Sequence, residues 1–294
     1  MGSATELHRC LGWISHQTGV QTCALPICSL PLEIVQLTQL QSLDLWGNQL
    51  SVLPGEIGQL TSLRLLSLWR NQLSQLPHEI GQLANLQLLD LMDNQLNQLP
   101  PEIIQLNKLQ SLYLSNNQLS QLPPEIVRLT NLLSLDLSYN QLSDLPSEVN
   151  QLTSLQALYL GRNQLNTLSL NISQLTKLKI LDLSSNRLSQ LPPNIGNLTL
   201  LEELLLGNTT KFDRTKDKNL RARSVVTSRS TSIGNHLSSL PGEIVQFTSL
   251  QSLDLSNNQL SQLPGEIIQL TSLQSLDLSG NQLSALPGEI GQLT

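Results

Sequence analysis

The sequence of 294 residues predicts an α/β solenoid, with a parallel sheet on its concave side and short helical or 3-10 turns on its convex side. Three observations support this fold class. A pattern of 23 residues recurs along the chain, leucine alternates with other residues in its first half, and Leu-Pro-x-Glu-Ile recurs in its second half. Self-similarity at a fixed period of about 20–50 residues is typical of repeat architectures.

The first half of each repeat reads L-x-x-L-x-L-x-x-N, as in Leu40, Leu43, Leu45 and Asn48. Leucines two positions apart indicate a short strand with one buried face, because side chains alternate between the two faces of a strand. Ten copies of this leucine triplet are present in the chain.

The second half of each repeat reads x-L-x-x-L-P-x-E-I-x-x-L, and in the first copy it includes Pro54, Glu56, Ile57 and Leu60. We expect proline at the first helical position, where its missing N–H costs nothing. Glutamate suits the positive end of the helix dipole. Ile57 and Leu60 are three residues apart, so they share one helical face and point inward.

One repeat buries too little surface to fold alone, so neighbouring repeats must complete its core and its strand ladder. Stacked strands lie about 4.8 Å apart, whereas packed helices need about 8–10 Å. A stack with strands on one side and helical turns on the other therefore curves, with the sheet inside. The concave sheet is the natural binding surface.

One asparagine ends the first half of nearly every repeat. Its amide can both donate and accept hydrogen bonds, and buried backbone groups in the turn after the strand need such partners. The spacing of 23 residues breaks after Asn186, where Thr209 occupies the next position, and it resumes at Asn235. We expect a structural ladder of Asn48, Asn71, Asn94, Asn117, Asn140, Asn163, Asn186, Asn258 and Asn281.

These two signatures resemble the leucine-rich-repeat family, in its 23-residue intracellular subtype, which includes Ras-scaffold-like, plant Ras-group and bacterial Roco-type proteins. The stretch 265–271 is similar to repeats of cyanobacterial and bacterial Roco-type proteins, so the resemblance favours a bacterial source. It covers about residues 30–208 and 235–294. It implies a curved horseshoe that binds another protein.

Two segments depart from the repeat, and they set the predicted organisation. Residues 1–29 form an irregular lead-in, residues 30–208 hold repeats, residues 209–234 are a basic, disordered insertion, and residues 235–294 hold further repeats without a C-terminal cap. We therefore expect a fragment of a longer protein. The lead-in has three interpretations, namely a zinc site, a cysteine cap and an artefact, since residues 19–27 resemble translated sequencing-adapter sequence. Its candidate metal ligands are His8, Cys10, His16, Cys23 and Cys28.

The residues between the strand leucines face the concave side. Trp46, Trp69 and Met92 occupy equivalent positions in consecutive repeats, and this predicts an exposed apolar ridge near the N-terminal end. Exposed tryptophan and tyrosine are typical hot spots of interfaces. The alternative is drift of the repeat, with the aromatic side chains packed on each other. The predicted partner-binding residues are Asp44, Trp46, Ser67, Trp69, Asp90, Met92, Tyr113, Asp136 and Tyr159.

Charge and motifs exclude several function classes. The net charge is −6, and because residues 211–229 carry seven cations and two anions, the rest of the chain carries −11. An acidic body argues against nucleic acid as the main partner. The sequence contains no phosphate-binding loop, nucleophile elbow or kinase motif set, so we expect no catalytic residue, no metal and no cofactor. No run approaches the roughly 18 apolar residues of a membrane helix.

The predicted function is a protein-interaction module or scaffold in signal transduction, monomeric and cytoplasmic, that binds a partner on its concave face. Two alternatives stay open. The chain could be the recognition region of a larger signalling enzyme, such as a Roco-type GTPase or kinase. It could also be an extracellular or host-directed receptor or effector.

Overall fold

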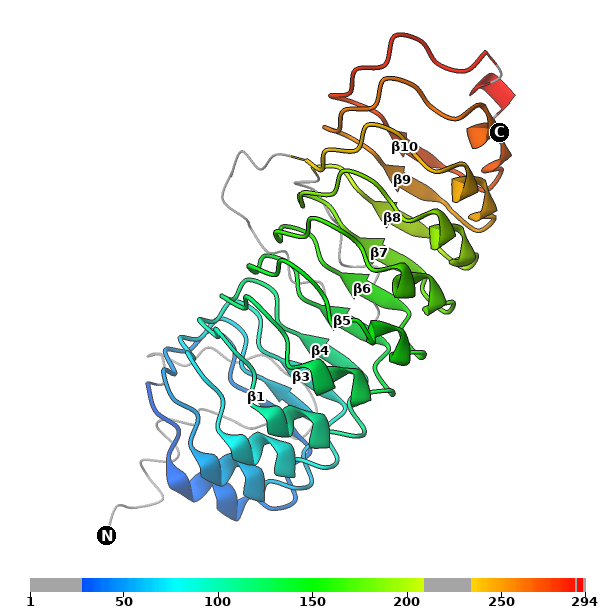
Figure 1. The fold of residues 1–294 in the computed structure, drawn as a ribbon. Coiled ribbons are helices and arrows are strands. Elements are labelled where there is room, and N and C mark those ends of the chain that lie inside the picture. The colour runs from blue at the N-terminus through cyan, green and yellow to red at the C-terminus, as the bar shows by residue number, and fades with distance from the viewer. Residues whose placement is uncertain (1–27, 209–233, 289, 293–294) are drawn as a thin grey trace.

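The computed structural model describes residues 28–208, 234–288 and 290–292. Within them, ten short strands form one parallel sheet in chain order, and a second row of 3-10 turns runs beside it (Figure 1). The predicted α/β solenoid is confirmed, with its sheet on the concave side and its 3-10 turns on the convex side.

Each strand contains three residues and comes from one leucine triplet. The strands are β1 (Ser42–Asp44), β2 (Leu65–Ser67), β3 (Leu88–Asp90), β4 (Ser111–Tyr113), β5 (Ser134–Asp136), β6 (Ala157–Tyr159), β7 (Ile180–Asp182), β8 (Glu203–Leu205), β9 (Ser252–Asp254) and β10 (Ser275–Asp277). Leu43 pairs with Leu66, and Leu66 pairs with Leu89. Equal repeat lengths therefore place the leucines of neighbouring strands directly side by side.

The convex row consists of 3-10 helices, mostly of five residues. They are η1 (Leu32–Gln36), η2 (Gly55–Gln59), η3 (His78–Gln82), η4 (Pro101–Gln105), η5 (Pro124–Arg128), η6 (Val149–Gln151), η7 (Leu170–Gln174), η8 (Pro193–Asn197), η10 (Gly242–Gln246), η11 (Gly265–Gln269) and η12 (Ile290–Gln292). The isoleucine that follows glutamate, such as Ile57 in η2, is fully buried or nearly so from η1 to η11, and Ile290 in η12 is partly buried. The prediction that this face points inward is confirmed.

Proline stands one position earlier than predicted in most turns. Pro54 is extended, with φ −68° and ψ 147°, and its carbonyl accepts the first hydrogen bond of η2 from the N–H of Ile57 at 3.1 Å. Proline is thus the residue before the helix, because a 3-10 helix begins with a bond from residue i+3 to residue i. Only in η4, η5 and η8 does a second proline occupy the first helical position, as predicted.

Turn η7 has the usual length of five residues although it lacks the proline and glutamate of the repeat. Ser169 and Asn171 occupy those two positions. The Ser169 hydroxyl accepts a hydrogen bond from the Asn171 backbone N–H at 3.2 Å. Serine is a favoured N-cap because it satisfies one of the unpaired donors at a helix start. A side-chain cap therefore takes the place of proline.

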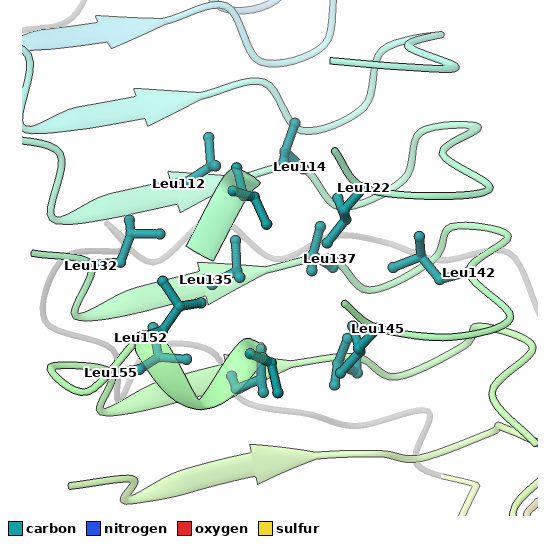
Figure 2. Packing of buried hydrophobic residues seen from close by; sticks show 14 of the residues in the cluster. Leu112, Leu114, Leu122, Leu132, Leu135, Leu137, Leu142, Leu145, Leu152 and Leu155 are labelled. Atoms are coloured by element: carbon teal, nitrogen blue, oxygen red, sulfur yellow. The ribbon is translucent and has the colours of Figure 1, made fainter. Parts of the chain in front are cut away.

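The core is one continuous cluster of aliphatic side chains between the two rows. Leu112, Leu135 and Leu158, from β4, β5 and β6, are at most 2% exposed. Figure 2 shows how side chains of successive repeats, such as Leu114 and Leu137, line up between the strands and the turns. Each leucine is thus buried by its counterparts in the repeats on both sides.

The asparagine ladder is present from Asn71 onward, and Asn48 donates to the carbonyl of Leu45 in its own repeat at 2.9 Å. The Asn71 amide donates to the carbonyl of Leu68 in its own repeat at 2.9 Å and to that of Leu45 in the preceding repeat at 2.9 Å. Its oxygen accepts from the N–H of Leu50 at 3.0 Å. The same bridging bonds recur from Asn94 through Asn281, so each asparagine ties two repeats together.

Asn235 also belongs to this ladder, although our predicted ladder omits it. It donates to the carbonyls of Leu206 and Leu183 and accepts from the N–H of Leu188, at separations of 29, 52 and 47 residues. For Asn71 the same three bonds span 3, 26 and 21 residues. The difference is 26 residues in each case, so Asn235 occupies the ladder position at which Thr209 is due by spacing. Strand β8 pairs with β9 in the usual register, Leu204 with Leu253.

The predicted lead-in and basic insertion lie almost wholly outside the described residues, so their boundaries stay predictions. This includes the candidate metal ligands of the lead-in apart from Cys28, which is exposed. In the part of the chain that the structure describes, no helix has the length and apolarity needed to cross a bilayer.

Candidate functional site

The face of the sheet that points away from the leucine core carries the predicted binding residues. The exposure of this face differs from one strand to another. Ser42 and Asp44 on β1 and Trp46 just after it are exposed, and the Trp46 side chain keeps 45% of its area accessible. Among the described strands, β1 pairs with β2 alone, so no described strand flanks these side chains on the other side.

The prediction of an exposed ridge is wrong for Trp69 and Met92. These two residues and Tyr113 form a buried cluster, with exposures of 6%, 1% and 1%. Their strands are about 4.8 Å apart, so large side chains at equivalent positions fill the space between neighbours. The alternative interpretation, in which the aromatic side chains pack on each other, describes them correctly, and Trp46 alone keeps the predicted exposure.

A network of side chains fixes the position of Trp69. Its indole N–H donates to Asp93 Oδ2 at 3.0 Å, and Asp93 Oδ1 accepts from the Asn116 amide at 2.7 Å. The Arg70 guanidinium carbon lies 5.7 Å from the Trp69 ring centroid. Trp46 stacks on this fixed indole, with ring centroids 5.3 Å apart and planes at 23°. We call Trp46, Trp69, Arg70 and Asp93 the aromatic platform.

The other predicted site residues lie on the same face but are buried. Ser67, Asp90, Asp136 and Tyr159 are at most 6% exposed. They follow one another along β2, β3, β5 and β6, so the structure places them in one row rather than around one point.

The aspartates of this face have a local structural role that the sequence analysis missed. Asp90 Oδ1 accepts the backbone N–H of Met92 at 3.1 Å, and Asp136 and Asp182 accept that of the residue two positions on at 3.0 and 2.9 Å. Asp44, Asp254 and Asp277 do the same. An aspartate that bonds its own backbone two residues on stabilises a turn. The sequence contains a signal of this structural role, because aspartate recurs at the last position of the predicted strands.

Aspartate occupies every second strand from β1 to β9, and only β9 and β10 place two side by side. Like charges directly opposite each other in a sheet are destabilising, so the alternation keeps most of these carboxylates two strands apart. Burial raises the pKa of Asp254, and the neighbouring Asp277 raises it further, against the lowering effect of hydrogen bonds from Ser256. Asp254 and Asp277 are therefore the one pair of aspartates on adjacent strands among the described residues.

Sequence reasoning also missed Arg70 and Asp93, the polar members of the platform. Both belong to a column of residues, one before each ladder asparagine other than Asn235, whose backbone is left-handed, with φ of 53° and 50° at Arg70 and Asp93. The column begins at Gly47, with φ 71°. Alignment of the repeats around Trp46 and Trp69 would have revealed Arg70, because it stands directly beside a tryptophan at a variable position.

Among the described residues, no three histidine, cysteine, aspartate or glutamate side chains gather in a way that could hold a metal ion. The arrangement offers aromatic surface, carboxylates and backbone groups of the β1 edge. These are the elements of a recognition surface.

Comparison with family models identifies the repeats. Models described as "Leucine-rich repeat region" and "Leucine rich repeat" match residues 55–137 and 234–283, and a third, "Leucine Rich Repeat", matches residues 39–60, 131–152 and 177–198. A solved leucine-rich-repeat protein of Leptospira interrogans is 40% identical over 91% of this chain and 79% of its own, with a TM-score of 0.57. The chain belongs to the leucine-rich-repeat family.

Other similar structures of the leucine-rich-repeat fold are plant receptors. The Arabidopsis receptor kinase HAESA, solved with the peptide hormone IDA and the co-receptor SERK1, is 28% identical with a TM-score of 0.67. The plant peptide hormone receptor RGFR1, solved with RGF2, is 30% identical with a TM-score of 0.56. They match 83% and 90% of this chain, which spans only 39% and 51% of theirs. The search of curated proteins found no match.

Proposed function

We propose that this leucine-rich-repeat chain is a non-catalytic recognition module that binds a protein or peptide on the concave face, at the end formed by β1. The observation that carries the proposal is the aromatic platform. Trp46 is a large exposed side chain held in place by Trp69, which is itself fixed by Asp93. A rigid exposed aromatic side chain is the usual anchor of an interface, because little conformational entropy is lost on binding.

The similar structures support a peptide or protein as the ligand. HAESA was solved with the peptide hormone IDA and the co-receptor SERK1, and the peptide hormone receptor RGFR1 was solved with RGF2. The chain spans about half or less of those receptors, which favours a second candidate, the ligand-binding region of a larger receptor or signalling protein. Both candidates assign the same task to the concave face of this chain.

Site-specific photocrosslinking tests which face binds. A photoreactive amino acid is placed at Ser42, exposed on β1, or at Glu56, exposed on the convex turn η2. Each protein is irradiated in an extract of the organism that encodes the chain. We expect discrete crosslinked products from position 42 that are absent from position 56.

Competition shows whether the aromatic platform is responsible for crosslinking from position 42. An excess of unlabelled wild-type chain should remove the products from position 42, and an excess of Trp46→Ala should not. The circular dichroism spectrum of Trp46→Ala should match the wild type, because Trp46 lies outside the leucine core. Equal crosslinking from both faces, or equal competition by both proteins, contradicts the proposal.

A further inference from the structure

Two neighbouring repeats of this chain carry tryptophan at the same position and differ in the residue that follows it. The first reads Leu45-Trp46-Gly47-Asn48 and the second reads Leu68-Trp69-Arg70-Asn71. β1 and β2 pair with Leu43 opposite Leu66, so the two segments occupy equivalent places in neighbouring repeats. The position after tryptophan therefore holds arginine in one repeat and no side chain in the other.

The chain itself pairs guanidinium groups with aromatic rings at this loop position. Arg70 lies over Trp69 at 5.7 Å, and Arg162, from the same column, lies over the Tyr139 ring at 4.9 Å. Both are within the roughly 6 Å at which a cation is attracted to the face of an aromatic ring. The fold therefore brings an arginine from this column over an aromatic ring in two separate places.

In the repeat of β1, the space that a side chain at position 47 would enter is open. A Cβ atom built on Gly47 meets no atom within 4 Å. The adjacent Trp46 is 45% exposed, and Asp44, two residues before it, is exposed on the same face. Asp44 Oδ1 accepts the Trp46 N–H at 3.3 Å, which fixes the carboxylate close to the backbone of the tryptophan.

We propose that Trp46 and Asp44 receive an arginine side chain of the binding partner, in the place that Arg70 takes over Trp69. The inference rests on the proposed function and specifies the chemistry of its ligand. The guanidinium lies against the Trp46 ring beside Gly47 and pairs with the Asp44 carboxylate.

Arginine fits this arrangement better than lysine. Its planar guanidinium can stack on an indole and still direct N–H groups at a carboxylate, whereas an ammonium group is a compact and strongly hydrated point charge. Residues outside the segment 211–229 carry a net charge of −11. An acidic body favours a cationic partner by electrostatic complementarity.

Nuclear magnetic resonance tests the inference with a small probe. The full chain labelled with ¹⁵N is titrated with Nα-acetyl-arginine amide, and the indole N–H signal of Trp46, assigned with Trp46→Phe, is followed. We expect a saturable shift of that signal. The citrulline analogue, which has the same shape without the charge, should give no saturable shift, and the lysine analogue should bind at least threefold more weakly.

Substitutions at position 47 provide a matched pair. Gly47→Arg supplies the guanidinium from the chain itself and should abolish the shift. Gly47→Asn introduces a side chain at the same positive φ, which asparagine tolerates, and should bind the probe like the wild type. Arg70 shows that arginine is accommodated in this backbone conformation, with φ 53°. Asp44→Asn should weaken binding about fivefold, as expected for loss of an exposed ion pair.

Three results would overturn the inference: equal shifts with the arginine and citrulline probes, equal affinity for arginine and lysine, and unchanged binding by Gly47→Arg in a protein with native circular dichroism. The proposed function has a separate test. Selective crosslinking from position 42 together with any of these three results would retain the binding face and reject arginine as its ligand.

Discussion

At the scale of single residues, each ladder asparagine pairs three backbone groups with one short side chain. Each buried amide satisfies two carbonyl groups and one N–H group from two repeats, as Asn117 does for Leu91, Leu114 and Leu96. An aspartate offers no donor and a leucine offers neither donor nor acceptor. Asparagine therefore suits this position, because three backbone groups must be paired where water has no access.

Asn117→Ala should lower the free energy of unfolding by about 3–5 kcal/mol, because each buried polar group left without a partner costs about 1–3 kcal/mol. Urea unfolding followed by circular dichroism measures the change. The matched control is Asn97→Ala in the preceding repeat, since Asn97 is exposed and should change stability by no more than about 0.5 kcal/mol. If the two substitutions cost the same, the ladder does not support the fold as described.

At the scale of the elements, one position in the convex turns controls how closely those turns pack. Gly58, Gly81 and Gly196 follow the buried isoleucine, and a Cβ atom on any of them would lie 2.5–2.6 Å from a backbone carbonyl oxygen of the next turn. In η4 and η5 the same position holds Ile104 and Val127. Turns η2, η3 and η4 consequently approach each other more closely than η4, η5 and η6. Hydrogen bonds fix the spacing of the strands. The residue that follows the isoleucine in each turn therefore changes the spacing on the convex side alone, and with it the local curvature.

Gly81→Ala should therefore destabilise the protein by about 1–3 kcal/mol, the usual cost of forcing an extra methyl group into a packed site. Gly265→Ala is the matched control, because a Cβ atom there meets nothing within 4 Å. It should leave stability unchanged or raise it by about 0.4–1 kcal/mol through the lower entropy of the unfolded chain. Thermal unfolding of the two variants beside the wild type measures the difference. An equal effect of both would show that the turns are not in close contact.

At the scale of the whole molecule, the repeat explains why the fold was predictable while the candidate site was only partly so. The spacing of Leu43, Leu45 and Asn48 predicts the strand, the core and the ladder, because these depend on the same residues at the same positions in neighbouring repeats. The burial of Trp69 and Met92 depends on which large side chains happen to be adjacent, and a pattern of positions does not contain that information. The position of Arg70 over Trp69 depends in the same way on side-chain conformation.

β10 is the last strand in the part of the chain that the structure describes, and it has one described neighbour. Each repeat is stabilised by its neighbours alone, so a repeat with one neighbour is held less firmly than a repeat with two. Leu253 and Leu255 in the repeat of β9 are at most 1% exposed, whereas Leu276 and Leu278 in the repeat of β10 are only partly buried. The N–H of Leu255 is bonded to the carbonyl of Asp277 on β10, and β10 pairs with β9 alone among the described strands.

Hydrogen exchange can measure this difference with an internal control in the chain. Residues 250–260 and 273–283 have the same sequence apart from Asn257 and Gly280, so their intrinsic exchange rates nearly match. We expect amides of 273–283 to exchange at least about tenfold faster, because opening of the last repeat breaks only one interface, whereas opening of 250–260 disrupts two. Exchange followed by mass spectrometry of peptic fragments resolves the two segments. Equal protection would mean that the solenoid opens as one unit, and that the partly buried leucines in the repeat of β10 contribute as much to its stability as the buried leucines in the repeat of β9.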